Sequence, residues 1–122
     1  MAHMNVLIVE DEPTHREAAK AFLEEEGWVI TTVENGQKAL EIVQKNAFDI
    51  ILLDLRMPVL DGFAFLEQYP RSMRPDGMKI IVMTNLAADP DAERAVRMGA
   101  DAYLVKSDID VDQLKVSIEK LL

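Results

Sequence analysis

Residues 50–62 read IILLDLRMPVLDG, and this stretch decides the fold because an apolar run ends there in an acidic residue and a turn. The four side chains at 50–53 are all apolar and do not alternate with polar ones. A strand with that pattern is covered on both faces, which is typical of a parallel sheet between helices. We therefore expect a buried strand that ends at Asp54, then a loop, and a helix from about Gly62 to Tyr69.

Four similar short runs, apolar or β-branched, surround this strand in the sequence, at residues 6–9, 29–33, 80–83 and 102–105. The stretches between the runs have apolar residues at helical spacing, and so does the stretch after the last run. Alternating strands and helices with short connections predict right-handed crossovers. The expected fold is α/β, a (βα)5 doubly wound sheet of five parallel strands.

Start and stop signals set the bounds of the expected helices. The first begins at Pro13 and stops at Gly27, and the fourth runs from Asp89-Pro90 to Gly99. The second follows Asn35-Gly36, with an apolar stripe that reaches Ala47. Asp61 and Asp89 are the expected N-caps of the third and fourth helices, and Asp108 or Asp110 caps the fifth. The segment 70–77 holds two prolines and a glycine, which predicts a mobile connection.

Composition limits the classes of function. The 122 residues are 49% apolar and 29% charged, which suits one globular domain. The formal charge of −9 makes nucleic acid and membrane surfaces unexpected partners. The absence of cysteine excludes disulfides, thiolate zinc sites and cysteine nucleophiles, and it fits a reducing cytoplasm, where we expect the protein.

The ends of the chain add two expectations. Residues 1–3 resemble a remnant of an expression vector ahead of a start at Met4, so His3 is excluded from the chemistry. The expected domain spans 4–122, with no output domain in this chain.

Ligands of an open α/β sheet bind outside the carboxyl ends of the strands, where the winding direction switches. With strand order 2-1-3-4-5, the first and third strands are neighbours there, and Glu10, Asp11 and Asp54 converge. Three carboxylates in one pocket repel one another unless a cation neutralises them. A set of oxygen ligands without histidine or cysteine indicates Mg²⁺ in preference to zinc.

Thr84 and Lys106 follow the fourth and fifth strands and stand opposite these acids in the expected fold. A hydroxyl donor and an ammonium group are suited to the oxygens of a phosphoryl group. A metal, an ammonium and a hydroxyl around one carboxylate would stabilise phosphoryl transfer by positioning and electrostatics. Asp54 is the candidate acceptor, as an aspartyl phosphate.

The sequence resembles the receiver domains of two-component response regulators over essentially all of residues 4–122. The motifs that carry the resemblance are VLIVED at 6–11, DLRMPVLDG at 54–62, MT at 83–84 and GADAYLVK at 99–106. The resemblance implies the flavodoxin-like receiver fold and transfer of a phosphoryl group to Asp54 with Mg²⁺. The donor would be a sensor histidine kinase or a histidine phosphotransfer protein.

The same resemblance implies roles for further residues. The backbone carbonyl of Arg56 would join Glu10, Asp11 and Asp54 as a metal ligand. Thr84 and Lys106 would draw toward the phosphoryl group, and Tyr103 would rotate inward. This switch would alter the face of the fourth helix, fifth strand and fifth helix, which would bind an effector protein or form a homodimer.

Two departures from the family pattern carry expectations of their own. Ser107 stands where family members usually have proline, so we expect a trans bond, an altered loop and a shifted Lys106. Arg56 and Leu86 border the expected path of attacking water, and their size suggests slow self-dephosphorylation.

Other readings of single residues are simpler. Asp11 could be the N-cap of the first helix, and His15 a surface residue. The acidic run at 24–26 fits a solvated helix face, and Met57 fits packing beneath the acceptor loop. Tyr103 could be a packing residue.

Two other functions compete with the receiver assignment. One is an interaction module that works without phosphorylation, which Ser107 favours and the intact acidic set opposes. The other is a phosphohydrolase of the haloacid dehalogenase type, which would need an acid where Arg56 stands. We therefore expect no enzyme that turns over an external substrate.

Overall fold

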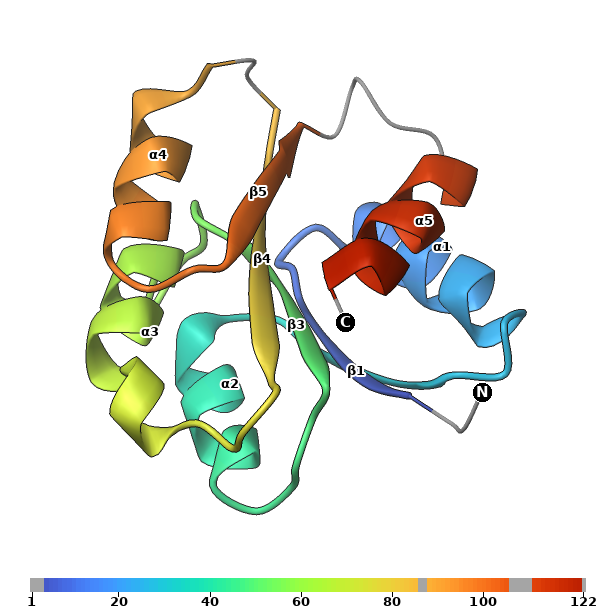
Figure 1. Ribbon diagram of the computed structural model, residues 1–122, viewed down its shortest axis with the longest axis horizontal. Helices are drawn as coiled ribbons and strands as arrows, with labels where there is room; N and C mark the ends of the chain where they lie inside the picture. Colours follow the sequence, from blue (N-terminus) through green and yellow to red (C-terminus); the bar gives the residue numbers. More distant parts are fainter. Residues whose placement is uncertain (1–3, 86–87, 106–110, 122) are drawn as a thin grey trace.

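The computed structural model describes residues 4–85, 88–105 and 111–121. These residues form one sheet of five parallel strands in the order β2-β1-β3-β4-β5, as predicted (Figure 1). The strands are β1 (Asn5–Val9), β2 (Val29–Val33), β3 (Ile50–Asp54), β4 (Lys79–Thr84) and β5 (Ala102–Val105). Residues 1–3, Leu86, Lys106, Ser107, Asp108 and Asp110 lie outside the described residues, so the expectations placed on them remain predictions.

Helices cover both faces of the sheet, with α1 and α5 on one side and α2, α3 and α4 on the other (Figure 1). Their bounds are α1 (Pro13–Glu24), α2 (Gly36–Val43), α3 (Gly62–Gln68), α4 (Pro90–Arg97) and α5 (Val111–Leu121). A short 3-10 helix, η1 (Arg71–Met73), lies between α3 and β4.

Side chains of the three central strands alternate between two apolar cores. In β1, Leu7 and Val9 pack toward α2, α3 and α4, whereas Val6 and Ile8 pack toward α1 and α5. The run at 50–53 divides in the same way, and all four of its side chains are buried. Burial on both faces explains why these strands lack polar alternation.

The N-caps of α3 and α4 are confirmed. Asp61 accepts a hydrogen bond from the backbone N–H of Ala64 at 2.9 Å, and Asp89 accepts one from Asp91 at 2.9 Å. The expected extent of the second helix is wrong, because α2 ends at Val43 and Ala47 is exposed beyond it. The single methyl group of Ala47 offers too little apolar area to stabilise a further helical turn.

The connection between α3 and β4 is anchored, in contrast to the mobile segment that its composition predicts. Arg71 pairs with Asp101 at 2.9 Å, and Nη1 of Arg74 donates to the Gly99 carbonyl at 2.7 Å. Asp101 in turn accepts from the N–H of Ile80 at 2.8 Å. These partners lie more than twenty residues away, so composition alone does not reveal them.

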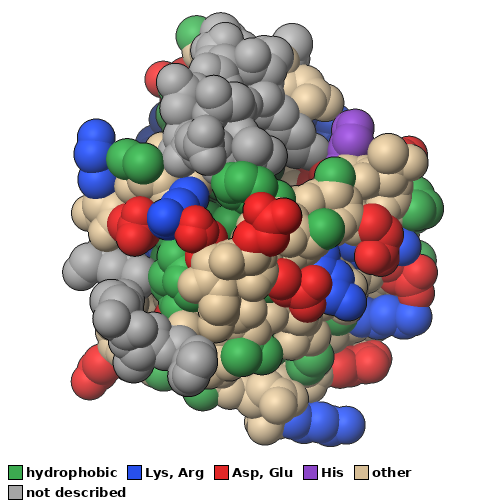
Figure 2. Space-filling view, turned by 90° about the vertical axis from the view of Figure 1, so that its right-hand side faces the viewer, with side chains coloured by type: hydrophobic (Ala, Val, Ile, Leu, Met, Phe, Trp, Pro, Cys, Tyr) green, Lys and Arg blue, Asp and Glu red, His purple; other side chains and the backbone are tan. Residues whose placement is uncertain are grey.

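The outer face formed by α1 and α5 carries acidic and basic side chains interspersed (Figure 2). Glu24 and Glu25 are exposed there, as a solvated helix face predicts, but Glu26 pairs with Lys115 of α5 at 2.7 Å. Among the described residues, no helix has the length and apolar character needed to cross a membrane.

Candidate functional site

Three carboxylates meet at the carboxyl edge of the sheet. Val9 and Leu53 pair in the register of β1 and β3, so the acidic residues that follow them emerge side by side. One oxygen each from Glu10, Asp11 and Asp54 lies within 4.8 Å of the other two. Glu10 is buried, Asp54 is half-buried and Asp11 is exposed. The convergence expected from the strand order is therefore present.

The start of α1 leaves Asp11 available to this cluster. The N-cap is Glu12, whose carboxylate accepts from the N–H of Thr14 at 3.1 Å. The alternative that Asp11 caps the helix is therefore wrong. Nη1 of Arg16, one turn into α1, donates to the backbone carbonyl of Glu10 at 2.9 Å and fixes the end of β1.

Two close approaches position the loop after Asp54. A Cβ on Gly62 would lie 2.7 Å from the backbone oxygen of Asp54, and one on Gly36 would lie 2.4 Å from that of Leu60. Only glycine allows this packing of α3 and α2 against the loop. Met57 is buried in the core, as expected.

The loop also contains a tight turn at Val59. The N–H of Leu60 donates to the carbonyl of Pro58 at 2.8 Å, and the φ of Val59 is 70°. This is a γ-turn, which is rare because it strains the central residue. The exposed Val59 therefore occupies a conformation that β-branched residues avoid.

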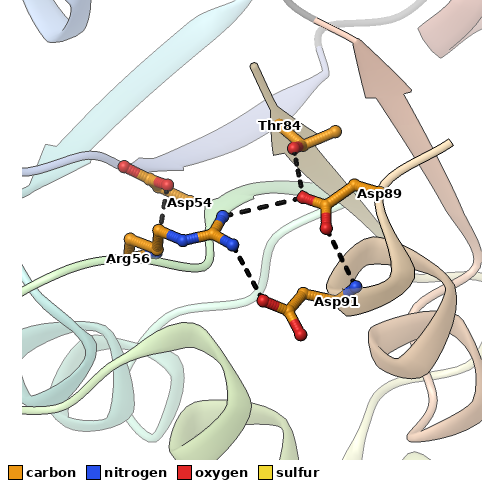
Figure 3. A network of polar contacts seen from close by, with 5 residues as sticks. All are labelled: Asp54, Arg56, Thr84, Asp89 and Asp91. Carbon is orange, nitrogen blue, oxygen red and sulfur yellow. Dashed lines mark hydrogen bonds and ion pairs between the residues drawn. The ribbon is translucent and has the colours of Figure 1, made fainter. Parts of the chain in front are cut away.

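A polar network joins Asp54 to the first turn of α4 (Figure 3). The N–H of Arg56 donates to Oδ1 of Asp54 at 3.2 Å, and its guanidinium pairs with Asp91 at 2.8 Å and with Asp89 at 3.6 Å. Thr84, at the end of β4, donates its hydroxyl to Oδ2 of Asp89 at 2.7 Å. Thr84 and Asp89 are both buried.

The network keeps Asp89 ionised. The hydroxyl of Thr84 contributes most, followed by the N–H of Asp91, and with Arg56 they hold the pKa of Asp89 below its ordinary value despite burial. Each of these groups donates hydrogen bonds or positive charge to the carboxylate. Asp89 is therefore an anion at neutral pH.

An open pocket of about 260 Å³ lies over the site. Its lining combines the acidic cluster with residues from β4 and α1: Glu10, Asp11, Glu12, His15, Asp54, Arg56, Met83, Thr84 and Asn85. His15 is an exposed residue, as expected, and its Nδ1 lies 3.9 Å from a carboxylate oxygen of Glu10. Tyr103 on β5 is half-buried and packs against the core on the α2, α3 and α4 side.

Comparison with known proteins identifies the family. Residues 6–119 match the family described as the response regulator receiver domain. The chain belongs to this family. The receiver domain is 34% identical over 118 residues to the gliding motility regulatory protein of Myxococcus xanthus. The alignment covers 97% of this chain but only 15% of the length of the Myxococcus protein.

Solved receiver structures agree with the fold. The receiver domain of a sensor histidine kinase from Pseudomonas aeruginosa is 30% identical, with a TM-score of 0.85 and 98% of each chain covered. The chemotaxis response regulator CheY4 of Vibrio cholerae is 28% identical, with a TM-score of 0.86. That alignment covers 99% of this chain and 100% of CheY4.

Sequence reasoning missed two side chains of the receiver site. Asp89 was predicted only as a cap, although an N-cap aspartate uses one oxygen and leaves the second for another donor. Arg16 was not singled out, because nothing in a helical pattern shows that an arginine reaches back to the preceding strand. The available signal was that Thr84 and Asp89 stand only five residues apart in the sequence.

Proposed function

We propose that this receiver domain is a phosphoacceptor, which takes a phosphoryl group onto Asp54 from the phosphohistidine of a sensor histidine kinase or a histidine phosphotransfer protein. The observation that carries the proposal is the cluster of Glu10, Asp11 and Asp54, with one oxygen of each within 4.8 Å of the others. The family match over residues 6–119 supports it, and we propose 4–122 as the extent of the domain.

In the transfer, a carboxylate oxygen of Asp54 forms a bond to phosphorus while the bond between phosphorus and the donor's imidazole nitrogen breaks. The electron pair stays on that nitrogen, which takes up a proton. Negative charge on the phosphoryl oxygens requires donors around them. Thr84 is proposed to supply a hydroxyl, and Lys106, which follows β5 in the sequence, to supply an ammonium.

The donor set of the cluster fits a hard divalent cation, because all of its ligand atoms are carboxylate oxygens. We assign Glu10, Asp11, Asp54 and the backbone carbonyl of Arg56 as ligands of Mg²⁺. Bound Mg²⁺ would offset the mutual repulsion of the acids and the charge of the phosphoryl oxygens. The Pseudomonas receiver domain, described with a magnesium ion in its active site cleft, supports this assignment.

The output of the switch is proposed to be a changed protein surface. Thr84 and Tyr103 would respond to the phosphoryl group, and the face of α4, β5 and α5 would bind an effector protein or a second copy. Signalling is the general role of the family. We expect no turnover of external phosphomonoesters, which incubation with p-nitrophenyl phosphate checks. The cysteine-free composition supports a cytoplasmic location.

Intact mass spectrometry after incubation with acetyl phosphate and Mg²⁺ tests the proposal. The parent should gain one phosphoryl group, Asp54→Asn should gain none, and a chelator should suppress the gain in the parent. Asp61→Asn is the matched control, because Asp61 caps α3 and should leave labelling intact. Labelling that persists in Asp54→Asn, or no labelling of the parent, would refute the assignment.

A further inference from the structure

The Thr84 hydroxyl is already committed in this structure. It donates to Oδ2 of Asp89 at 2.7 Å, and both residues are buried. The proposed function requires the same hydroxyl to donate to a phosphoryl oxygen on Asp54. A hydroxyl carries a single hydrogen, so it cannot serve both acceptors at once.

Arg56 forms a second connection between Asp54 and the first turn of α4 (Figure 3). Its backbone N–H contacts Asp54 at 3.2 Å, while its guanidinium lies 2.8 Å from Asp91 and 3.6 Å from Asp89. The side chain of Arg56 is 59% exposed, so its guanidinium can reorient without opening the core. A phosphoryl group on Asp54 would carry close to two negative charges in place of the one on the carboxylate, and it would compete with Asp89 and Asp91 for the guanidinium of Arg56.

We propose that Asp89 is a positioning residue that holds the Thr84 hydroxyl away from Asp54, and that the phosphoryl group must displace Asp89 before the switch completes. This inference rests on the proposed function and goes beyond it. No covalent bond changes in the step. Thr84 keeps its hydrogen and exchanges one acceptor, Oδ2 of Asp89, for another, a phosphoryl oxygen. Arg56 weakens its pairs with α4 at the same time, so the first turn of α4 is released.

The hydrogen bond from Thr84 to Asp89 lowers the apparent affinity of the site at Asp54 for a phosphoryl group or its analogue. Only molecules in which Thr84 has left Asp89 can offer the full set of donors, and a ligand's apparent affinity falls in proportion to that fraction. A hydrogen bond to an ionised acceptor lowers the fraction of molecules in which Thr84 has left Asp89 by about tenfold or more. Weakening this one bond should therefore tighten binding of a phosphoryl analogue by about tenfold.

Asp89→Asn separates this role from helix capping. Asparagine caps helices as well as aspartate does, so the bond from Oδ1 to the N–H of Asp91 can persist. The amide nitrogen that replaces Oδ2 donates and cannot accept the Thr84 hydrogen. Asp61→Asn is the matched control, since Asp61 caps α3 through a hydrogen bond of the same 2.9 Å length and lies outside the network of Thr84, Asp89 and Arg56. Asp89→Ser is a second variant, because its single oxygen can cap but is too short to hold Thr84 as well.

The experiment is calorimetric titration of beryllium trifluoride, a phosphoryl mimic, in the presence of Mg²⁺. Asp89→Asn and Asp89→Ser should bind about tenfold more tightly than the parent, and Asp61→Asn should bind like the parent. In a Thr84→Val background, which lacks the hydroxyl, Asp89→Asn should lose most of its effect, because only the longer 3.6 Å pair with Arg56 remains to be changed. A merely structural role of Asp89 would not depend on that hydroxyl.

Three results would overturn the inference: unchanged affinity in both Asp89 variants, weaker binding, or an equal effect in the Thr84→Val background. These failures are distinct from failure of the proposed function. If the parent accepts phosphoryl on Asp54 and binds the mimic, the function stands while the role of Asp89 falls. If the parent does neither, the function itself is refuted.

Discussion

Replacing Val59 by glycine should stabilise the domain, although most substitutions destabilise a protein. Val59 has a φ of 70° and its side chain is 80% exposed, so removing it loses little packing. A left-handed conformation costs an L-residue about 1–2 kcal/mol. Glycine also lowers the free energy of unfolding by about 0.4–1 kcal/mol, because it increases the conformational entropy of the unfolded chain. The balance is a gain of about 0.5–1 kcal/mol in the free energy of unfolding.

Urea unfolding followed by the fluorescence of Trp28 measures this change. Trp28 is the single tryptophan and is buried, so unfolding alters its surroundings. For a chain of this length the gain corresponds to about 2–4 °C in melting temperature. Val59→Ala should gain less than Val59→Gly, because alanine retains the Cβ that makes the conformation unfavourable.

Val29→Gly is the matched control, since Val29 is also an exposed valine, at 52%, but lies in the regular backbone of β2. That substitution should destabilise the domain, because glycine in a strand costs conformational entropy without relieving strain. A Val59→Gly variant less stable than the parent would refute the reasoning. The γ-turn would then not be a strained element of the folded state.

Three further outcomes are expected. Gly62→Ala should lower the free energy of unfolding by about 1–3 kcal/mol in urea titrations, because its Cβ would lie 2.7 Å from the backbone oxygen of Asp54; stability equal to the parent's would show that the loop yields freely. Burial raises the pKa of Tyr69 in the folded state above its ordinary value of about 10. The stability that the neutral phenol contributes is therefore fully present below pH 10 and is lost as the pH rises through the raised value. Tyr69→Phe should therefore lose less stability than the parent between pH 9 and pH 11 in urea midpoints; equal losses would contradict this. Arg56→Asn should shorten the lifetime of the aspartyl phosphate several-fold, measured by release of phosphate, whereas an unchanged lifetime would remove the shielding role of Arg56.

The fold was predictable because its signals are local and repeated. Apolar runs such as 50–53 mark strands buried on both faces, and Asp89-Pro90 marks a helix start through one side chain and one fixed φ. Right-handed crossovers leave more than one strand order open, and the order 2-1-3-4-5 is the one that the resemblance to receiver domains implies. That order brought Glu10, Asp11 and Asp54 together without any knowledge of side-chain geometry.

The contacts that adjust the site were not predictable from the same signals. Arg56 is 33 and 35 residues away from Asp89 and Asp91, and a long side chain can point in many directions from one backbone position. Arg71 and Arg74 also contact residues far along the chain, 30 and 25 positions away, at the opposite edge of the sheet. Such contacts depend on rotamers and on which acids the fold leaves within reach.

The two ends of α4 are secured by different kinds of contact. Beyond its final turn, Arg71 and Arg74 hold the link to β5 through Asp101 and through the carbonyls of Ala100 and Gly99. These contacts lie at the far edge of the sheet from the proposed phosphorylation site. If the proposed exchange frees the first turn of α4 while the segment after its last turn stays fixed, the helix would pivot about its C-terminal end. The displacement would then be largest at Pro90 and smallest at Arg97. The affinity of a protein that binds this helix would then depend more on the angle of the helix than on its position along its axis.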